Sequence, residues 1–231
     1  MSVVKSYPLA SDYKLDLGAP WEIPPSIVPR VEKIWELERE RRDTDLTNGQ
    51  IYTLAEFRPD YLLIHPSEYR YVLARRRAPN LKNEGLSVQP LAVTGILLCA
   101  DGLVLGRRGS VVTDDAGLWE PAPAGGLSKP DPTVQILEEL EEELGISKSE
   151  VESVEACGLV EDIESSVFDI VFRLNTTLTG QEVKAVHACR GSDEYADLAI
   201  VETSEVSAFL HTHSRDLLPA LRTMLRLAAI V

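Results

Sequence analysis

Five glutamates crowd the end of one predicted helix, and they are the side chains best suited to chemistry in this chain of 231 residues. They fall within the run LEELEEELGI and are Glu138, Glu139, Glu141, Glu142 and Glu143. No Lys or Arg occurs between Lys129 and Lys148 to offset their charge. Clustered carboxylates are the oxygen ligands that Mg²⁺ or Mn²⁺ prefers, so we expect a divalent cation to bind here.

The helix that carries the cluster has recognisable start and stop signals. Pro132 suits a first helical turn, and Asp131 before it can cap the free N–H groups. Gly145 suits the residue that follows the last turn. These signals predict a helix over 132–144.

The spacing of the acids places three of them on one face of this helix. At about 3.6 residues per turn, Glu139, Glu142 and Glu143 lie together, opposite an apolar stripe of Ile136, Leu137, Leu140 and Leu144. The acids occupy the C-terminal turns, where the helix dipole and like charges four residues apart both disfavour them. Because local rules are broken without a structural gain, we interpret this face as functional. An acidic face that only meets water is the alternative.

Charge and hydropathy limit the kind of protein that this can be. The formal net charge is −14, which argues against a nucleic-acid polymer as partner, because binding its phosphates needs a basic surface. The N-terminal segment lacks the apolar core of a signal peptide, and no apolar run reaches about 18 residues, so no membrane span is expected. The cysteines, Cys99, Cys157 and Cys189, are odd in number and scattered, as is typical of reduced thiols in a cytoplasmic protein.

Hydrophobic periodicity divides the chain into an N-terminal extension, 1–88, and a second domain, 89–231. In the extension we expect irregular chain at 1–25, helices at 26–44 and 69–77, and strands at 48–57 and 60–69. In the second domain we expect strands at 87–99, 103–108, 151–162, 166–177 and 197–202, and helices at 132–144, 204–213 and 214–230. An Asp101-Gly102 turn should join the first two of these strands. The pattern predicts a mixed sheet with helices on its faces, of the α/β or α+β class.

The order of strand, Gly-Gly loop, Glu-rich helix and strands resembles the Nudix hydrolase superfamily. The signature of that superfamily is G-x5-E-x7-R-E-U-x-E-E-x-G-U, where U is apolar. Its second half is matched in register, and Gly126 matches its opening glycine; the matching residues are Glu139, Leu140, Glu142, Glu143, Gly145 and Ile146. The extension is similar to that of atypical Nudix proteins typified by a UDP-glucose pyrophosphatase. The resemblance implies an α/β/α sandwich with a mixed sheet.

The chain also departs from the signature. Twelve residues lie between Gly126 and Glu139, where the signature has fourteen, and the upstream glutamate is missing. Glu138 stands in place of the arginine that normally orients the glutamates, an arginine that the atypical group also lacks. The alternative is therefore a non-catalytic Nudix fold that serves as a nucleotide-binding or protein-interaction module.

The resemblance implies roles for the carboxylates. It makes metal ligands of Glu139, Glu142 and Glu143, and gives catalytic roles to Glu142 and Glu143. A late loop often contributes one further catalytic carboxylate in this superfamily. Glu194 is the candidate, with Asp193 as the near alternative, and an ordinary loop acid is the other interpretation.

Two further pairs of residues could bind the substrate. Arg107 and Arg108 close an expected strand, and arginines can clamp phosphate oxygens, although a solvated strand end is the alternative. Gly125 and Gly126 would let the backbone come close to metal or phosphate.

The expected function is hydrolysis of a nucleoside diphosphate linked to another group, with Mg²⁺ or Mn²⁺ as cofactor. The resemblance favours a nucleoside-diphosphate sugar, in particular a UDP-sugar, which would yield NMP and a sugar phosphate. The partner is then a small nucleotide. Many members of the superfamily form dimers, so a homodimer is one assembly that the resemblance allows.

Overall fold

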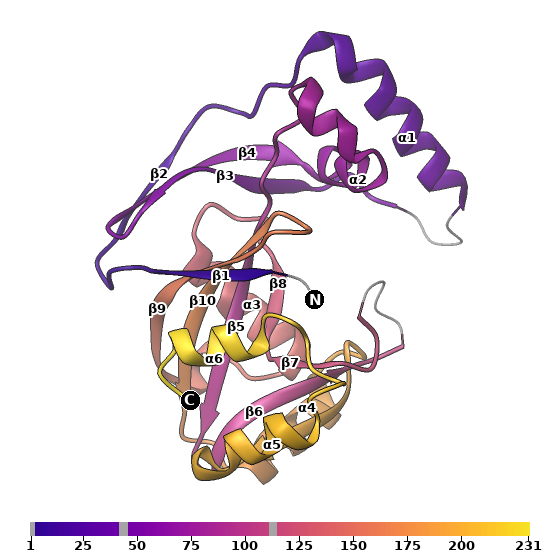
Figure 1. Cartoon of the computed structure of the whole chain (residues 1–231). Coiled ribbons are helices and arrows are strands. Elements are labelled where there is room, and N and C mark those ends of the chain that lie inside the picture. Colours follow the sequence, from indigo (N-terminus) through magenta and orange to yellow (C-terminus); the bar gives the residue numbers. More distant parts are fainter. Residues whose placement is uncertain (1–2, 42–45, 111–114) are drawn as a thin grey trace.

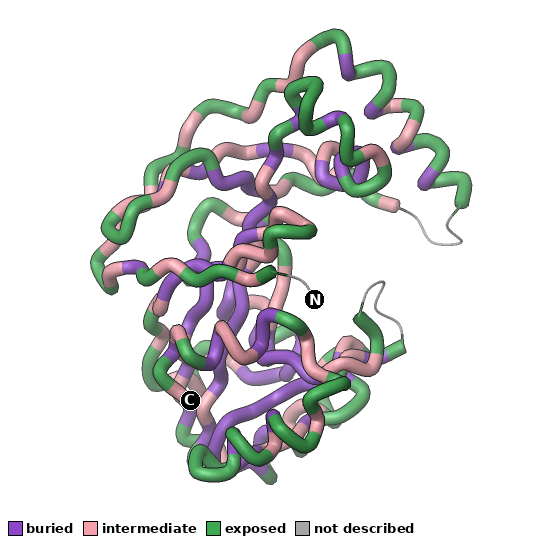
Figure 2. Tube along the Cα trace, viewed as in Figure 1, coloured by how far each residue is buried: buried purple, intermediate pink, exposed green. Residues whose placement is uncertain are grey.

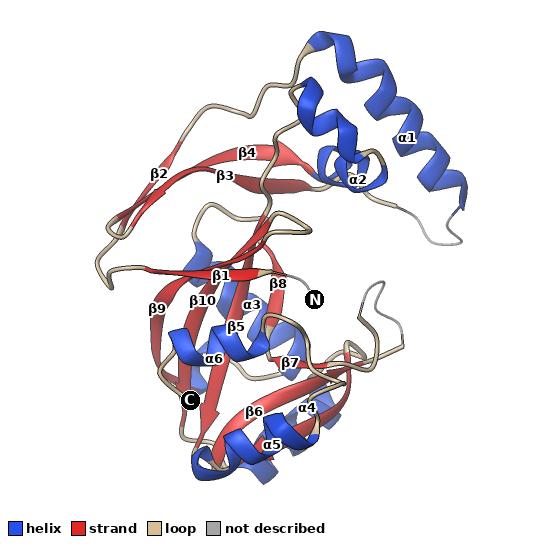
Figure 3. Ribbon diagram, in the orientation of Figure 1, coloured by secondary structure: helices blue, strands red, loops and turns tan. Residues whose placement is uncertain are grey.

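The computed structural model describes residues 3–41, 46–110 and 115–231 (Figure 1). Its strands are β1 (Val4–Pro8), β2 (Lys14–Leu17), β3 (Gln50–Arg58), β4 (Tyr61–Glu68), β5 (Leu91–Cys99), β6 (Gly102–Arg108), β7 (Trp119–Pro121), β8 (Ala124–Gly126), β9 (Val151–Asp162), β10 (Val167–Thr176) and β11 (Tyr195–Val201). Its α-helices are α1 (Val28–Arg41), α2 (Tyr69–Arg77), α3 (Pro132–Leu144), α4 (Gly180–Arg190), α5 (Val206–Thr212) and α6 (Leu221–Leu227), as Figure 3 shows. Short 3₁₀ helices cover Pro25–Ile27, Pro79–Glu84, Lys148–Glu150 and Thr203–Glu205.

The larger of the two sheets is mixed. Its strand order is β1-β9-β10-β5-β6-β11, with β7 paired to β6 and β8 paired to β5. The central pair, β10 and β5, is parallel, whereas the flanking pairs are antiparallel. The sequence-based prediction of a mixed sheet is therefore confirmed.

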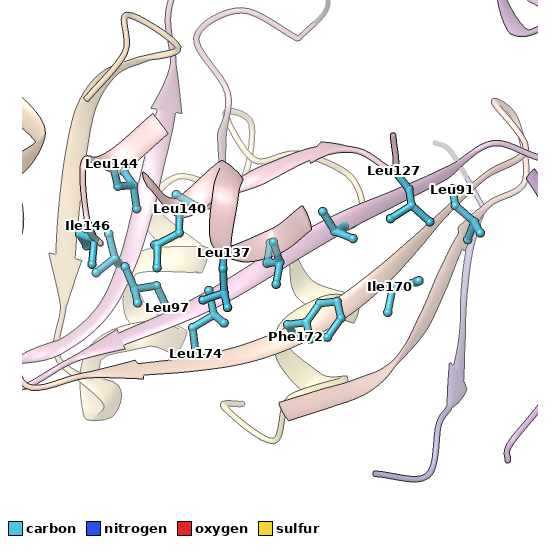
Figure 4. Close-up of a cluster of buried hydrophobic side chains, with 14 of the residues drawn as sticks. Leu91, Leu97, Leu127, Leu137, Leu140, Leu144, Ile146, Ile170, Phe172 and Leu174 are labelled. Carbon is cyan, nitrogen blue, oxygen red and sulfur yellow. The ribbon is translucent and has the colours of Figure 1, made fainter. Parts of the chain in front are cut away.

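Helices cover both faces of this sheet. On one face, Leu140 and Leu144 of α3 and Val183 of α4 pack on buried side chains of β5 and β10 (Figure 4). On the other face, Leu210 of α5 and Leu221 of α6 pack, among others, on Leu103, Leu105 and Val171. Figure 2 shows the buried strands between these layers. The result is the expected α/β/α sandwich, formed because every face of the sheet is apolar and needs cover.

The extension builds a second, smaller sheet in the order β2-β4-β3, with α1 and α2 beside it (Figure 1). Two backbone hydrogen bonds join it to the sandwich. The N–H of Tyr52 donates to the carbonyl of Leu127 at 2.9 Å, and the N–H of Leu54 donates to the carbonyl of Gln89 at 2.8 Å. Buried Leu54, Leu62 and Ile64 join the same core as α3. The division at residue 88 stays a prediction.

Several expectations for single elements need correction. Residues 1–25 are not irregular, because β1 and β2 lie there, and β1 is an edge strand of the large sheet. Helix α4 was not expected, and the C-terminal helix is confined to α6, after Pro219. The expected helix at 26–44 ends at Arg41 in the described chain, and its last residues lie outside the described ranges.

The helix that carries the glutamate cluster agrees with its prediction at both ends. Asp131 caps it by accepting from the N–H groups of Thr133 and Val134, at 2.9 and 3.3 Å. Gly145 adopts a left-handed φ of 71° after its last turn. Among the helices in the described residues, none is both long and apolar enough to cross a membrane.

Candidate active site

Glu143 is the most deeply placed acid of the cluster, with 4% of its surface exposed. Its Oε2 accepts hydrogen bonds from the N–H of Ala124, at 3.0 Å, and from the hydroxyl of Tyr195, at 2.9 Å. Burial, with the nearby charges of Glu194 and Glu139, raises the pKa of Glu143 from 4.5 to about 9. A carboxylate in this position is costly unless a proton or a cation shares its charge.

Tyr195 reaches Glu143 because glycine lies beneath its ring. A Cβ at Gly106 of β6 would overlap the ring of Tyr195, which is itself buried. The absent side chain therefore lets the first residue of β11 lie flat across the neighbouring strand, with its hydroxyl directed to α3.

Glu139 lies one turn earlier on α3 and rests on the Gly-Gly segment. Its Oε1 accepts a hydrogen bond from Nε2 of Gln135, at 2.7 Å. A Cβ at Gly125 would overlap the Glu139 carboxylate, so this carboxylate lies directly against the backbone of β8. Burial raises the pKa of Glu139, and the charges of Glu142 and Glu194 add to the effect.

A third acid, Glu120 of β7, faces the same region and is paired with Arg108. Nη1 of Arg108 lies 2.6 Å from Oε1 of Glu120, and Nη2 lies 4.0 Å from Oε1 of Glu194. Glu120 is 3% exposed, and burial raises its pKa to about 7 although Arg108 opposes the shift. Arg108 thus stands between a buried carboxylate and a more accessible one.

The loop that carries Glu194 is held at both sides by backbone bonds. The N–H of Gly109 donates to the carbonyl of Glu194 at 2.7 Å, and the N–H of Ser192 donates to the carbonyl of Glu143 at 3.2 Å. The loop therefore connects the end of β6 to the end of α3, and this connection brings Glu194 to the acids of the helix.

A cavity of about 370 Å³ opens beside these groups. The acids and the Gly-Gly segment form one part of its wall, with Arg108, Glu120, Glu194, Gly125 and Gly126. The extension supplies another part, with Ile51, Tyr69, Val72 and Arg76. Deeper in the cavity, the Thr94 hydroxyl donates to Oδ1 of Asp169 at 3.0 Å, and burial raises the pKa of Asp169 to about 6. The volume and the mixed lining suit a small polar molecule.

The donor set of this site fits a divalent cation. Burial raises the pKa values of Glu120, Glu139 and Glu143, and the nearby charge of Glu194 adds to each shift. A hard cation takes carboxylate oxygens of this kind as ligands. In the described ranges, no three acidic, His or Cys side chains already meet in the arrangement of a metal site. Binding would therefore require the carboxylates to draw together.

The structure brings most of the residues predicted from sequence to this one place, but not all. Glu139, Glu143, Glu194, Arg108, Gly125 and Gly126 gather there. Glu142 is exposed, and Arg107 directs its Nε to the carbonyl of Gly117, at 3.2 Å. Glu138, in the place of the signature arginine, forms an ion pair with Lys129. The roles of all these residues remain predictions.

Three residues of the site were not singled out by the sequence. Tyr195, Asp169 and Thr94 reach it through strand pairing between segments far apart in the chain, and no local motif marks such contacts. Glu120 also belongs to the site, from the short strand that precedes the Gly-Gly loop. Its position in a short strand between apolar residues, LWEPA, was the available signal for a buried acid.

Comparison with known proteins by sequence finds nothing similar: no protein-family model matches the chain, and no curated protein does. Comparison of structures finds Nudix hydrolases. DR0079 from Deinococcus radiodurans is 14% identical, with a TM-score of 0.47, over 59% of this chain and 81% of that one. RenU, a Nudix hydrolase from M. smegmatis, is 15% identical, with a TM-score of 0.43, over 62% and 85%.

The Nudix domain of Shewanella oneidensis NrtR, solved with ADP ribose, is 14% identical, with a TM-score of 0.45, over 66% of this chain and 96% of that domain. Because these identities and TM-scores are low, the function proposed below is argued from the side chains of the site alone.

Proposed function

We propose that this chain is a Nudix-type hydrolase that uses Mg²⁺ or Mn²⁺ to cleave a nucleoside diphosphate linked to another group. The observation that carries the proposal is the meeting of four acids from three separate segments: Glu120 and Glu194 line the cavity, and Glu139 and Glu143 lie beside its wall at Ala124 and Gly125. Four carboxylates this close together, two of them buried, are unfavourable unless a cation joins them. One guanidinium, that of Arg108, lies among them in the structure.

The proposed reaction assigns each group a task. A bound divalent cation supplies charge neutralisation for the diphosphate and a more acidic water. Glu139 and Glu143 hold the cation, together with Glu142 if this exposed side chain turns inward. Arg108 lies in the cavity wall and can donate to phosphate oxygens.

Glu194 is the best candidate to accept the proton of the attacking water. It lines the cavity, and its side chain is 34% exposed, so water reaches it. Gly125 and Gly126 line the same cavity and have no side chain to keep a phosphate from their backbone.

Within this class we propose a nucleoside-diphosphate sugar as substrate, with a UDP-sugar favoured, cleaved to NMP and a sugar phosphate. The support is the extension, whose side chains Ile51, Tyr69 and Val72 offer an apolar wall beside the acids, suited to a flat base or the face of a sugar. A cytoplasmic location and a homodimer also remain predictions.

The test is a panel of nucleotide-linked diphosphates with Mg²⁺ or Mn²⁺, followed by phosphatase-coupled phosphate release. We expect turnover by the wild type and a loss of about a hundredfold in Glu139→Gln and Glu143→Gln. Glu141→Gln is the matched control, because Glu141 is an exposed acid of the same helix. Wild-type rates no higher than those of Glu143→Gln on every substrate would overturn the proposal.

A second candidate function is nucleotide binding without hydrolysis. It is favoured by the Lys129–Glu138 ion pair, which replaces the orienting arginine of the signature. Calorimetric titration separates the two functions: a binding-only protein gives heat with the nucleotide and releases no phosphate.

A further inference from the structure

A second cavity, of about 550 Å³, adjoins the first. The two cavities share Arg76, Val167, Asp169 and Leu218 in their walls, so these residues lie where one opens to the other. Glu120, Glu194 and the Gly-Gly segment line only the first cavity. A molecule that spans both would therefore place one end at the acids and the other beyond Asp169.

Asp169 has a hydrogen-bond partner at this junction. It lies on β10 opposite Ala92 of β5, and the hydroxyl of Thr94, two residues along β5, donates to its Oδ1 at 3.0 Å. Thr94 is buried, with 2% of its surface exposed. Asp169 is half-buried and lies in the wall of both cavities. The bond from Thr94 orients its carboxyl where a ligand that enters can reach it.

The charges around the second cavity decide which end of a substrate fits there. Among the described residues, its wall has the acids Asp115, Asp162, Glu164 and Asp169 and one cation, Arg76. Phosphate would be repelled by this excess of carboxylates, whereas hydroxyl groups donate hydrogen bonds to them. Its apolar side chains, Val167, Leu218, Pro219 and Ala220, offer surfaces on which the C–H face of a ring can lie.

We propose that Asp169, positioned by Thr94, is a specificity-determining residue that accepts hydrogen bonds from the sugar hydroxyls of a nucleotide-sugar substrate. This inference rests on the proposed function, and it assigns the second cavity to the sugar and the first to the diphosphate. The chain would then select a polyhydroxylated leaving group through a site separate from its metal-binding acids.

The test compares wild type and Asp169→Asn on three kinds of compound: UDP-glucose, its monodeoxy-glucose analogues, and a methyl ester of UDP in which a methyl group replaces the glucosyl group. For UDP-glucose we expect the variant to raise KM about tenfold or more, the loss of one hydrogen bond to a charged group. For the methyl ester, and for the analogue that lacks the bound hydroxyl, KM should be the same in both proteins. Asp197→Asn is the control, since Asp197 is an exposed acid that lines neither cavity.

The role of Thr94 is tested by a conservative pair. Thr94→Val should raise KM for UDP-glucose and leave kcat nearly unchanged, and Thr94→Ser, which keeps the hydroxyl, should restore the wild-type KM. An equal rise of KM for UDP-glucose and for its methyl ester would overturn the proposal, as would an unchanged KM for both.

Failure of hydrolysis and failure of sugar recognition give different results. Calorimetric titration of UDP-glucose in the presence of Mn²⁺ measures binding, and the phosphatase-coupled assay in the same buffer measures turnover. If wild type binds about tenfold more tightly than Asp169→Asn but releases no phosphate, the sugar site holds and the hydrolase proposal fails. If turnover is seen and Asp169→Asn binds as tightly as wild type, the sugar site fails alone.

Discussion

The hydroxyl of Tyr195, at the start of β11, donates a 2.9 Å hydrogen bond to Oε2 of Glu143, near the end of α3. Both residues are buried, and the bond lowers the pKa of a carboxyl that burial otherwise raises to about 9. Tyr195 therefore favours the ionised form of Glu143, which is the form that binds a cation.

The first prediction concerns this bond. Tyr195→Phe removes the hydroxyl, so the pKa of Glu143 rises further and a cation must displace a more tightly held proton. We expect the half-saturating Mn²⁺ concentration to increase about threefold to tenfold, and the free energy of unfolding to fall by about 1 kcal/mol. Activity against Mn²⁺ concentration and thermal denaturation measure the two effects. The control is Tyr13→Phe, because Tyr13 is a half-buried tyrosine beside a different cavity. It should change neither the Mn²⁺ concentration needed nor the free energy of unfolding.

The second prediction uses the two glycines of β8. In Gly125→Ala the new Cβ overlaps the Glu139 carboxylate and must displace it, whereas a Cβ at Gly126 meets nothing within 4 Å. Neither glycine has a left-handed φ, so alanine suits both backbones. We expect Gly125→Ala to fold and to lose activity about a hundredfold, because the carboxylate is misplaced. Gly126→Ala should lose much less activity, because its Cβ leaves the Glu139 carboxylate in place. Equal losses in both variants would show that the Glu139 contact is not the cause.

The third prediction concerns the Arg108–Glu120 ion pair. Arg108→Met leaves a buried carboxylate without its partner, which should cost about 3 kcal/mol of unfolding free energy. Adding Glu120→Gln removes the uncompensated charge and should recover most of the stability but not the activity. Urea denaturation of wild type, Arg108→Met, Glu120→Gln and the double variant forms a double-mutant cycle. The control is Arg107→Met, because Arg107 is the exposed neighbour of Arg108. Its free energy of unfolding should stay within about 0.5 kcal/mol of wild type.

The fourth prediction is a pH dependence of stability. The pKa of Asp169 is raised from 3.8 to about 6 in the folded protein, so folding favours the protonated acid. The resulting stability is fully present below pH 3.8 and is lost as pH rises through about 6. Wild type should lose about 2 to 3 kcal/mol more than Asp169→Asn across this interval. Unfolding free energies at pH 4 and 7 check the difference, and identical pH profiles would contradict it; Asp197→Asn, an exposed acid, should follow wild type.

Sequence reasoning succeeded where local signals agreed with one another. The cap at Asp131, the left-handed Gly145 and the apolar stripe all describe α3, and the structure has the helix between the predicted residues. It failed where the local signal was weak or was not used. β1 and β2 are short strands with mostly exposed or half-buried residues, so no apolar alternation marks them. Helix α4 begins with a capping box of Thr179 and Glu182, a signal that was in the sequence.

The site was predictable along α3, in the Gly-Gly loop and at Arg108 and Glu194. Helical spacing predicts the same surroundings for Glu139, Glu142 and Glu143, but in the structure Glu143 is buried and Glu142 is exposed. The difference arises because β8 and Tyr195 cover one side of the helix end, and this depends on how β8 and β11 join the sheet. Strand pairing of that kind is long-range information that helical spacing does not contain.

The pairing of β1 with β9 has a topological consequence. The chain first contributes an edge strand to the sandwich, then leaves to build the small sheet with α1 and α2, and returns as β5. The small sheet and its helices are thus an insertion between two strands of one fold. The inserted segment lies between Pro8 and Leu91, whereas removing 1–88 would also take β1 from its place beside β9 and open a strand edge to self-association.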